Sequence, residues 1–248
     1  CTLLLKLECQ NPGNSIKDRI AVSMINRAEE EGRLQPGGTI YEGTAGNTGI
    51  ALALVGVSRG YKVKVVMPDK MSAGKISHLK ALGAEVVLTR SDVGRGHPQY
   101  YQDLARALAQ EDPNGFFINQ FENAANPTAH LETTGPEIWA QTEGNIDCFV
   151  AGIGSGGTVS GCGNYLREKN PDIELVLADP VGSILAPLIN EGKTIEAGSW
   201  LVEGVGEDFV PDIAEISLLN EAITVDDKES FLAARELLRA EGIMGGSS

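Results

Sequence analysis

Strand-like and helix-like hydrophobic patterns alternate along almost the whole chain, and this alternation restricts the possible folds more than any other feature. Short runs rich in β-branched residues are separated by segments with apolar residues at helical spacing. This order is typical of βαβ units, in which a helix joins two parallel strands. We therefore expect an α/β fold built from doubly wound parallel sheets. The expected strands are 39–43, 62–69, 84–89, 147–154 and 174–180, with a strand-like start at 2–8, and the expected helices are 19–32, 48–60, 75–83, 127–142, 158–169 and 228–242.

Length and charge restrict the function. A chain of 248 residues is long enough for one large or two smaller α/β domains. Its net charge of -14 argues against binding to nucleic acid or to an anionic membrane, since both need clustered Lys and Arg. No apolar run approaches the roughly 20 residues that span a bilayer, and no signal peptide is visible. We expect a cytoplasmic protein that acts on small molecules.

The cysteines and histidines suggest neither a metal site nor a disulfide framework. The 4 cysteines and 3 histidines are scattered, without any C-x-x-C pair. We expect the cysteines to be buried small side chains, and no bound metal. The Gly-rich stretch 182–206 is the least regular part of the sequence and is expected to be a mobile loop. The chain has no initial Met and stops just after a helix, so we expect it to be incomplete at both ends.

One Gly-rich loop has the features of a phosphate site. In "GIGSGGTVSG" a buried strand leads into a helix through residues that combine small size with hydroxyl groups. Glycines let the backbone approach an anion, the helix N-terminus directs amide groups at it, and hydroxyls add donors. For this loop alone, a dinucleotide site and a simple tight turn remain alternatives. The residues expected to hold phosphate are Gly154, Ser155, Gly156, Gly157 and Thr158.

A second loop, "EGTAGNTG", joins the strand at 39–43 to an apolar helix. Its amide groups suit a carboxylate, and the side-chain amide of Asn47 is a neutral donor for a phenolate-like oxygen. The alternative is structural, because Asn or Thr after a Gly turn is a common helix N-cap. The loop comprises Thr44, Ala45, Gly46, Asn47 and Thr48.

Lys17 lies in "NPGNSIKDR", where an amphipathic helix is about to begin. A lysine amine becomes a nucleophile when desolvation or nearby positive charge favours its neutral form, and the helix start near Ile16 supplies such a field. An amine, a phosphate site and a carboxylate site together suit pyridoxal phosphate. This phosphorylated aldehyde binds lysine as a Schiff base and acts as an electron sink for amino acids.

These motifs resemble the fold-type II family of pyridoxal-phosphate enzymes, which contains cystathionine β-synthase, cysteine synthase, threonine synthase and serine dehydratase. The resemblance runs from Leu3 to the last residue, with the motifs in the family's order and spacing. It implies two doubly wound parallel-sheet domains with the cofactor between them, and a homodimer. The smaller domain would span 12–124 and carry the carboxylate loop, and the larger, cofactor-binding domain would combine 1–11 with 125–248 and lack its C-terminal end. The motifs are "NPGNSIKDR", "EGTAGNTG", "INQFENAANP", "TTGPEIW", "GIGSGGTVSG", "EGVGEDFVP" and "EGIMGGSS".

The resemblance also assigns roles. Lys17 is similar to the Schiff-base lysine, which moves protons at the α-carbon of the substrate. Asn47 is similar to the residue that bonds the cofactor's ring hydroxyl, and Ser247 to the residue that faces the pyridine nitrogen. The loop from Gly154 to Thr158 matches the phosphate cup. The residues that match the substrate-carboxylate site are Thr44, Ala45, Gly46, Thr48 and Gln120.

Ser247 also bears on the type of reaction. A neutral hydroxyl cannot keep the ring nitrogen protonated as a carboxylate would, which favours loss of a β-substituent over a long-lived carbanion. The expected reaction is a β-replacement: L-serine or an activated serine forms an aminoacrylate, and a thiol adds to it. The segments "ADPVGS", "VEGVGEDFVP" and "RSDVGRGHPQYYQDLA" are similar to bacterial cystathionine β-synthases. We therefore expect homocysteine as the thiol and cystathionine as the product.

Three alternatives remain open. Cysteine synthase, with O-acetylserine and sulfide, is the nearest, because Ala45 replaces the Ser of most family members and Glu207 replaces the Tyr of animal and yeast cystathionine synthases. Glu207 and Asp208 are candidates for contacting homocysteine, although Glu207 is equally readable as a solvated loop carboxylate. A non-catalytic relative or binding module would have no need of Lys17. A nicotinamide-dependent oxidoreductase would use Asp179 and would also leave Lys17 unexplained.

Overall fold

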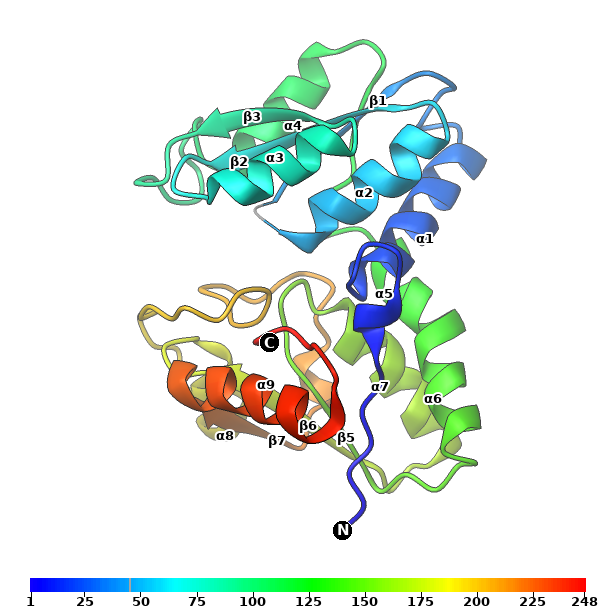
Figure 1. The fold of residues 1–248 in the computed structure, drawn as a ribbon, viewed down its shortest axis with the longest axis vertical. Helices are drawn as coiled ribbons and strands as arrows, with labels where there is room; N and C mark the ends of the chain where they lie inside the picture. Colours follow the sequence, from blue (N-terminus) through cyan, green and yellow to red (C-terminus); the bar gives the residue numbers. More distant parts are fainter. Residues whose placement is uncertain (45) are drawn as a thin grey trace. The chain divides into compact units, whose positions relative to one another are not determined.

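A computed structural model describes residues 1–44 and 46–248, so Ala45 lies outside the described residues. The expected α/β fold with parallel sheets is confirmed (Figure 1). The chain divides into two compact units. We call Gln10–Ala125 the small unit, and Cys1–Cys9 together with Asn126–Ser248 the large unit.

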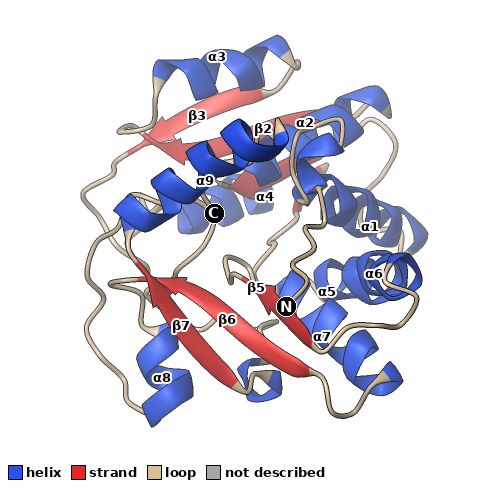
Figure 2. Cartoon of the chain, turned by 60° about the horizontal axis from the view of Figure 1, so that its bottom comes forward, coloured by secondary structure: helices blue, strands red, loops and turns tan. Residues whose placement is uncertain are grey.

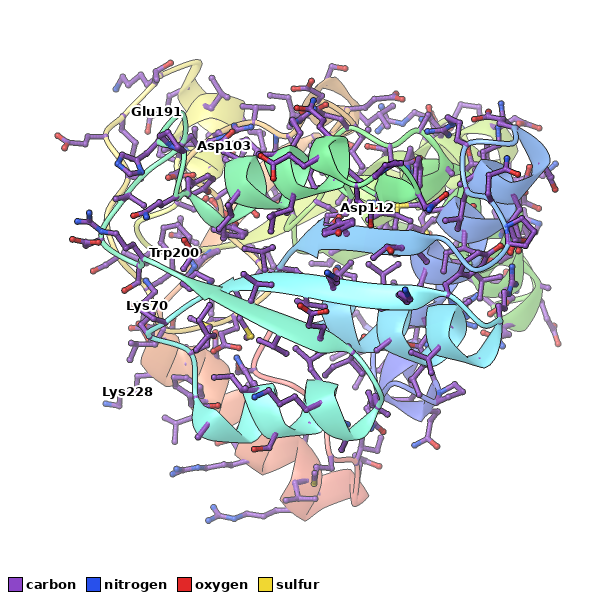
Figure 3. The ribbon with its side chains drawn as sticks, turned by 90° about the horizontal axis from the view of Figure 1, so that it is seen from above. Lys70, Asp103, Asp112, Glu191, Trp200 and Lys228 are labelled. Atoms are coloured by element: carbon purple, nitrogen blue, oxygen red, sulfur yellow. The ribbon has the colours of Figure 1, made fainter. Side chains whose placement is uncertain are left out.

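The small unit has a four-stranded parallel sheet in the order β3-β2-β1-β4. Helices α2 and α3 cover one face of this sheet and α4 covers the other, while α1 packs against α2 (Figures 1 and 3). The strands are β1 (Thr39–Gly43), β2 (Lys62–Pro68), β3 (Glu85–Thr89) and β4 (Gly115–Phe117). The helices are α1 (Lys17–Glu30), α2 (Asn47–Ser58), α3 (Ala73–Ala81) and α4 (Tyr101–Glu111).

The central strand β1 is buried along its whole length, because it has a strand on each side and helices over both faces. Helix formation on α1 follows from its apolar spacing, which buries Ile20, Met24 and Ile25. At the end of α4, the Asp112 carboxylate, labelled in Figure 3, accepts a hydrogen bond of 3.0 Å from the Tyr41 hydroxyl on β1. Because all residues of β1 are buried, its carboxyl end at Gly43 also lies inside the unit.

The large unit has a three-stranded parallel sheet in the order β5-β6-β7, and α8 packs against β7 (Figure 2). One apolar cluster lies around Ile153, Leu177 and Leu185, and another around Leu166 and Leu175. The strands are β5 (Cys148–Ala151), β6 (Glu174–Pro180) and β7 (Glu221–Val225). The helices are α5 (Ala125–Ala129), α6 (Gly135–Gln141), α7 (Gly157–Lys169), α8 (Leu185–Glu191) and α9 (Asp227–Glu241), with 3-10 turns at Glu8–Gln10 and Ile216–Leu218.

The helix expected at 127–142 is not regular. It consists of α5, a π-helical segment at His130–Thr134 and α6. Pro136 stands at the start of α6 and has no amide hydrogen, so it cannot continue an α-helical ladder from the preceding turn. The Thr133 hydroxyl also donates to the carbonyl of Ala129, four residues earlier. The interruption is therefore a local effect of Pro and Thr.

Other expectations need correction. Residues 2–7 form no regular element, so the strand-like start is wrong, because apolar composition alone does not supply a pairing partner. Within 182–206 the chain forms α8, although the rest of that stretch is irregular. The elements α4, β4, α8 and β7 were not expected from the sequence. Cys162 is buried, but Cys9 is only half-buried and both Cys1 and Cys148 are exposed, and all four are free thiols.

The irregular segment after α8 is nevertheless held by specific contacts. The indole nitrogen of Trp200, labelled in Figure 3, donates to the carbonyl of Val205 at 3.1 Å. Gly206 has a φ of 83°, and a Cβ there would collide with Pro180, so this turn requires glycine. None of the helices in the described residues is long and apolar enough to cross a membrane.

Candidate active site

Lys17 is the first residue of α1, and the preceding loop is held in a defined conformation. The side-chain amide of Asn11 donates to the carbonyl of Ser15 at 3.1 Å, and the Asp18 carboxylate accepts the amide of Gly13 at 2.6 Å. Asn14 adopts a left-handed φ of 58°, which Asn tolerates better than most residues. Among the described residues, no side chain makes a capping hydrogen bond at Ile16, the N-cap of α1. Lys17 thus stands at the positive end of a helix with a well-organised entry.

The loop after β1 leads directly into α2. The buried Thr44 hydroxyl accepts a hydrogen bond of 3.3 Å from the amide of Gly46, and the Thr44 amide donates to the carbonyl of Val66 at 3.0 Å. Gly46 is the N-cap of α2, and no side chain of the described residues makes a capping hydrogen bond there. The structural alternative, in which Asn47 or Thr48 caps the helix, is therefore wrong. Asn47 is exposed on the first turn.

Two segments of the small unit meet through buried side chains. The Thr48 hydroxyl donates to Oε1 of Gln120 at 2.7 Å, and Nε2 of Gln120 donates to Oε1 of Glu42 at 3.4 Å. The backbone amides of Asn119 and Gln120 also bond the Glu42 carboxyl. All three side chains are buried, with Glu42 only 1% exposed. The carboxylate loop and Gln120, predicted to act together, therefore do lie together.

Burial raises the pKa of Glu42 to about 8, because removal from water penalises the charged carboxylate. The amides of Asn119 and Gln120 lower this pKa, as does the more distant charge of Arg106, but burial outweighs them. Oε2 of Glu42 has no hydrogen-bond partner among the described residues. At neutral pH the group is mainly a neutral carboxyl.

In the large unit, the loop between β5 and α7 is shaped by glycines. Gly156 is the N-cap of α7 with a left-handed φ of 91°, and a Cβ there would collide with Ala214. A Cβ on Gly157 would strike the side chain of Asn126, and one on Gly154 would strike the carbonyl of Gly204. Side chains are therefore excluded from the start of α7, where an anion would meet backbone amides.

Two hydroxyl groups of this loop contact buried polar side chains from the segment that begins at α5. Asn126 is fully buried, and its Nδ2 donates to the Ser155 hydroxyl at 2.9 Å. The ring of His130 lies 2.9 Å from the Thr134 hydroxyl through Nδ1 and 3.4 Å from the Thr158 hydroxyl through Nε2. These contacts fix the positions of the Ser155 and Thr158 oxygens. The loop therefore presents neutral amide and hydroxyl groups, which suit a phosphate group.

Ser247 belongs to the same unit, and it is half-buried in the segment after α9. A Cβ on Gly204 would lie 3.9 Å from the hydroxyl of the neighbouring Ser248, and Gly204 in turn packs on Gly154. The C-terminal segment thus lies near the Gly-rich loop through Gly204.

The acidic candidates differ in their surroundings. The amide of Glu207 donates to the Ser183 hydroxyl at 3.2 Å, which fixes its backbone, and its side chain is half-buried, whereas Asp208 is exposed. Asp179 is 1% exposed, and its carboxylate accepts the amide of Ala186 at 2.9 Å. Asp179 is thus occupied in fixing the turn into α8. This position does not suit a contact to the ribose of a dinucleotide.

The sequence interpretation missed three supporting residues. Glu42 sits in an apolar strand just before a Gly-rich loop, and an acid in that setting is the one signal that could have marked it. Asn126 lies in the motif "INQFENAANP" but was given no role, and His130 lies in a region read only as helix. Their roles depend on the fold, which brings them under a loop that is distant in sequence.

The family profile and similar curated proteins all point to pyridoxal-phosphate enzymes. The sequence profile of the family described as pyridoxal-phosphate dependent enzyme matches residues 1–248. Cystathionine beta-synthase of Apis mellifera is 47% identical over 249 residues, covering 100% of this chain and 49% of that protein. The Saccharomyces cerevisiae protein of the same name is 46% identical over 250 residues, covering 98% and 49%. The chain therefore spans about half the length of these relatives. Cysteine synthase 1 of Neurospora crassa is 44% identical over 253 residues, covering 100% and 67%.

Solved structures agree with the sequence relatives. A hydrogen sulfide-producing enzyme from Fusobacterium nucleatum matches with a TM-score of 0.88 and 38% identity, covering 98% of this chain and 79% of that one. The structure of O-ureido-L-serine synthase matches with a TM-score of 0.89 and 36% identity, covering 97% and 73%.

Proposed function

The chain belongs to the family of pyridoxal-phosphate dependent enzymes, and from this membership we propose that it catalyses a β-replacement on L-serine or an activated serine. Homocysteine is the incoming thiol and cystathionine is the product. The observation that carries the proposal is the buried hydrogen bond between Thr48 and Gln120, because it joins the two segments that we assign to an amino-acid carboxylate.

The residues present fit the cofactor. Glycine positions where a Cβ would collide leave the start of α7 open to a phosphate, and the Ser155 and Thr158 hydroxyls add neutral donors. We assign the phosphate to this loop, the ring hydroxyl to Asn47, the ring nitrogen to Ser247 and the covalent link to Lys17. Pyridoxal phosphate, when bound, supplies an electron sink for the electron pair at the α-carbon of the substrate.

Residues of the small unit also bind the carboxylate of the substrate and move the proton of its α-carbon. Amides and hydroxyls of the loop around Thr44, Gly46 and Thr48 hold the carboxylate, together with Gln120 and with Ala45, which lies outside the described residues. The amine of Lys17 takes the α-proton and later returns it, which requires a neutral amine close to that carbon.

Homocysteine is preferred over sulfide because the curated relatives named above include cystathionine beta-synthases at 46% and 47% identity. Glu207 and Asp208 are the proposed contacts for the amino group of the thiol substrate. Cysteine synthase is the second candidate, and the 44% identity to Neurospora crassa cysteine synthase 1 supports it. Ala45 is the residue most relevant to the choice between serine and O-acetylserine.

The test is a comparison of kcat/KM for two substrate pairs with the full-length protein loaded with pyridoxal phosphate. We expect serine with homocysteine to give cystathionine at a higher kcat/KM than O-acetylserine with sulfide gives cysteine. The reverse order would establish the cysteine synthase reading. No product from either pair would favour a non-catalytic relative or binding module.

The proposal also covers the cellular location and the oligomeric state of the enzyme. We place the enzyme in the cytoplasm, acting on small amino acids, and we expect a homodimer. Light scattering of the full-length protein should give about twice the mass of one chain. A monomer with full activity would remove the dimer from the account.

A further inference from the structure

Glu42 is a buried ionisable group that the proposed reaction does not use. It lies on β1, two positions before the carboxylate loop begins at Thr44, and is 1% exposed. A carboxyl group is costly to bury, and the described residues give its Oε2 no hydrogen-bond partner. Arg106 contributes a favourable charge interaction that is smaller than the penalty of burial. The attraction between Glu42 and Arg106 therefore does not account for the burial of the Glu42 carboxyl.

The bonds that Glu42 does make all lead to one turn. Its carboxyl accepts the backbone amides of Asn119 and Gln120 and, at 3.4 Å, the side-chain amide of Gln120. Asn119 adopts a left-handed φ of 51°, a conformation that costs energy outside glycine. The carbonyl of Asn119 accepts the amides of Glu122 and Asn123 at 3.2 Å and 3.0 Å, so the turn is closed on its other side as well.

The side-chain amide of Gln120 is oriented from both ends. Its Oε1 accepts the hydroxyl of Thr48 at 2.7 Å, while its Nε2 points at Oε1 of Glu42. Because Oε1 of Glu42 accepts from Nε2 of Gln120, the proton of the neutral carboxyl belongs on Oε2, and a flipped amide would set its carbonyl against the accepting Oε1. Glu42 thus selects one of the two amide orientations, and this choice in turn determines where the Thr48 hydroxyl hydrogen points.

We propose that Glu42 is a positioning residue for the amino-acid carboxylate site: it fixes the side-chain amide of Gln120 and, through Gln120, the hydroxyl of Thr48. This inference rests on the proposed function, in which Gln120 and the loop at Thr44 to Thr48 hold the carboxylate of the substrate. Glu42 itself takes no part in proton transfer. Its Oε1 needs only to remain an acceptor.

The need for an acceptor makes the variants specific. Glu42→Gln keeps an acceptor oxygen and nearly the same shape, so it should change the KM for L-serine less than threefold. Glu42→Leu keeps the approximate volume but removes the acceptor, and should raise this KM about tenfold with a smaller change in kcat, as expected for lost ground-state binding. Glu111→Gln, an exposed acid on α4, is the control for the loss of one carboxylate.

A second measurement tests the orientation without turnover. In ¹⁵N-labelled full-length protein, the side-chain NH₂ signals of Gln120, assigned by their loss in Gln120→Ala, should be protected from hydrogen exchange in wild type and in Glu42→Gln. They should lose that protection in Glu42→Leu, while the circular dichroism spectrum and thermal transition show that this variant is folded. If Glu42→Leu does not fold, Glu42→Ser, which is too short to reach Gln120, replaces it.

The outcomes separate the two proposals. Protection that is unchanged without the Glu42 acceptor, or an unchanged KM in a folded variant, would overturn the role of Glu42 while leaving the β-replacement intact. Lost protection in a protein that never turns over serine would support the role of Glu42 in orienting Gln120 and would refute the proposed reaction.

Discussion

The hydroxyl of Thr48 and the side-chain oxygen of Gln120 are joined by a hydrogen bond of 2.7 Å although 72 positions separate them in sequence. Both side chains are buried, so the bond is shielded from competing water. It links the start of α2 to the turn after β4. The carboxylate site that we propose is therefore one connected structure.

Replacing Thr48 by Val tests this link. The valine keeps the shape but leaves Oε1 of Gln120 buried without its donor, which should lower the free energy of unfolding by about 1–3 kcal/mol. The KM for L-serine should rise as well. Urea denaturation measures the first effect, with Ser58→Ala, an exposed hydroxyl on the same helix, as the control. An equal decrease in the free energy of unfolding of both variants would mean that the buried bond stabilises the fold no more than the exposed one.

Lys17 is predicted to be indispensable for turnover. Lys17→Ala should reduce kcat by at least about 1,000-fold, because both the covalent link to the cofactor and the proton acceptor are lost. Circular dichroism should show an unchanged fold, since Lys17 is the first residue of α1 and not part of its buried face. Lys62→Ala, an exposed lysine at the start of β2, is the matched control. Full activity of Lys17→Ala would contradict the role of Lys17 as covalent link and proton acceptor.

The Gly-rich loop is predicted to be intolerant of a single methyl group. Gly157→Ala would bring a Cβ against the buried side chain of Asn126, so the affinity for pyridoxal phosphate should fall about tenfold or more. Titration of the cofactor-free protein, followed by absorbance, measures this affinity. Gly74→Ala, on α3, where only the Ser72 hydroxyl lies within 4 Å of the added Cβ, is the control and should bind the cofactor normally. Normal binding by both variants would exclude this loop as the phosphate site.

Glu42 is predicted to make the fold less stable at alkaline pH. The pKa of Glu42 is raised from 4.5 to about 8, so the folded protein keeps a proton that the unfolded chain releases. The free energy of unfolding should therefore fall as pH rises from about 4.5 to about 8, by at most about 5 kcal/mol at about 1.4 kcal/mol per pH unit, and then stay level.

Glu42→Gln should abolish this fall, because its amide does not titrate. Denaturation curves of wild type and variant, recorded from about pH 5 to about pH 9, measure the difference, and Glu111→Gln serves as the control. Stability curves that run parallel for wild type and Glu42→Gln would show that Glu42 is ionised at neutral pH.

The sequence was sufficient for the family, the parallel sheets and several elements. The family resemblance of the motifs is confirmed by the match over residues 1–248. The strands 39–43 and 174–180 were predicted with the bounds that β1 and β6 have, because short apolar runs that end at Gly or Pro indicate both the type of element and its boundary. The strand β4 has three residues and no pattern long enough to recognise.

What could not be predicted depends on contacts between distant residues. No periodicity shows that Glu42 would be buried against the turn at Asn119, or that His130 would lie beside the Thr158 hydroxyl. The π-helical segment at His130–Thr134 likewise depends on a local hydrogen-bond choice that a helical pattern does not distinguish. The side-chain assignments themselves, from Lys17 to Ser247, stay predictions until they are tested in the protein.

The central claim is that the α-proton of serine is removed during the reaction and replaced afterwards, with Lys17 as the carrier. The most direct measurement is the mass of cystathionine made from unlabelled L-serine and homocysteine in D₂O by the full-length protein loaded with pyridoxal phosphate. We predict one deuterium at the serine-derived α-carbon in most product molecules, because the lysine amine exchanges its protons with solvent before it returns one. Cystathionine without deuterium at that carbon would contradict the claim that a solvent-exchanging amine of Lys17 carries this proton.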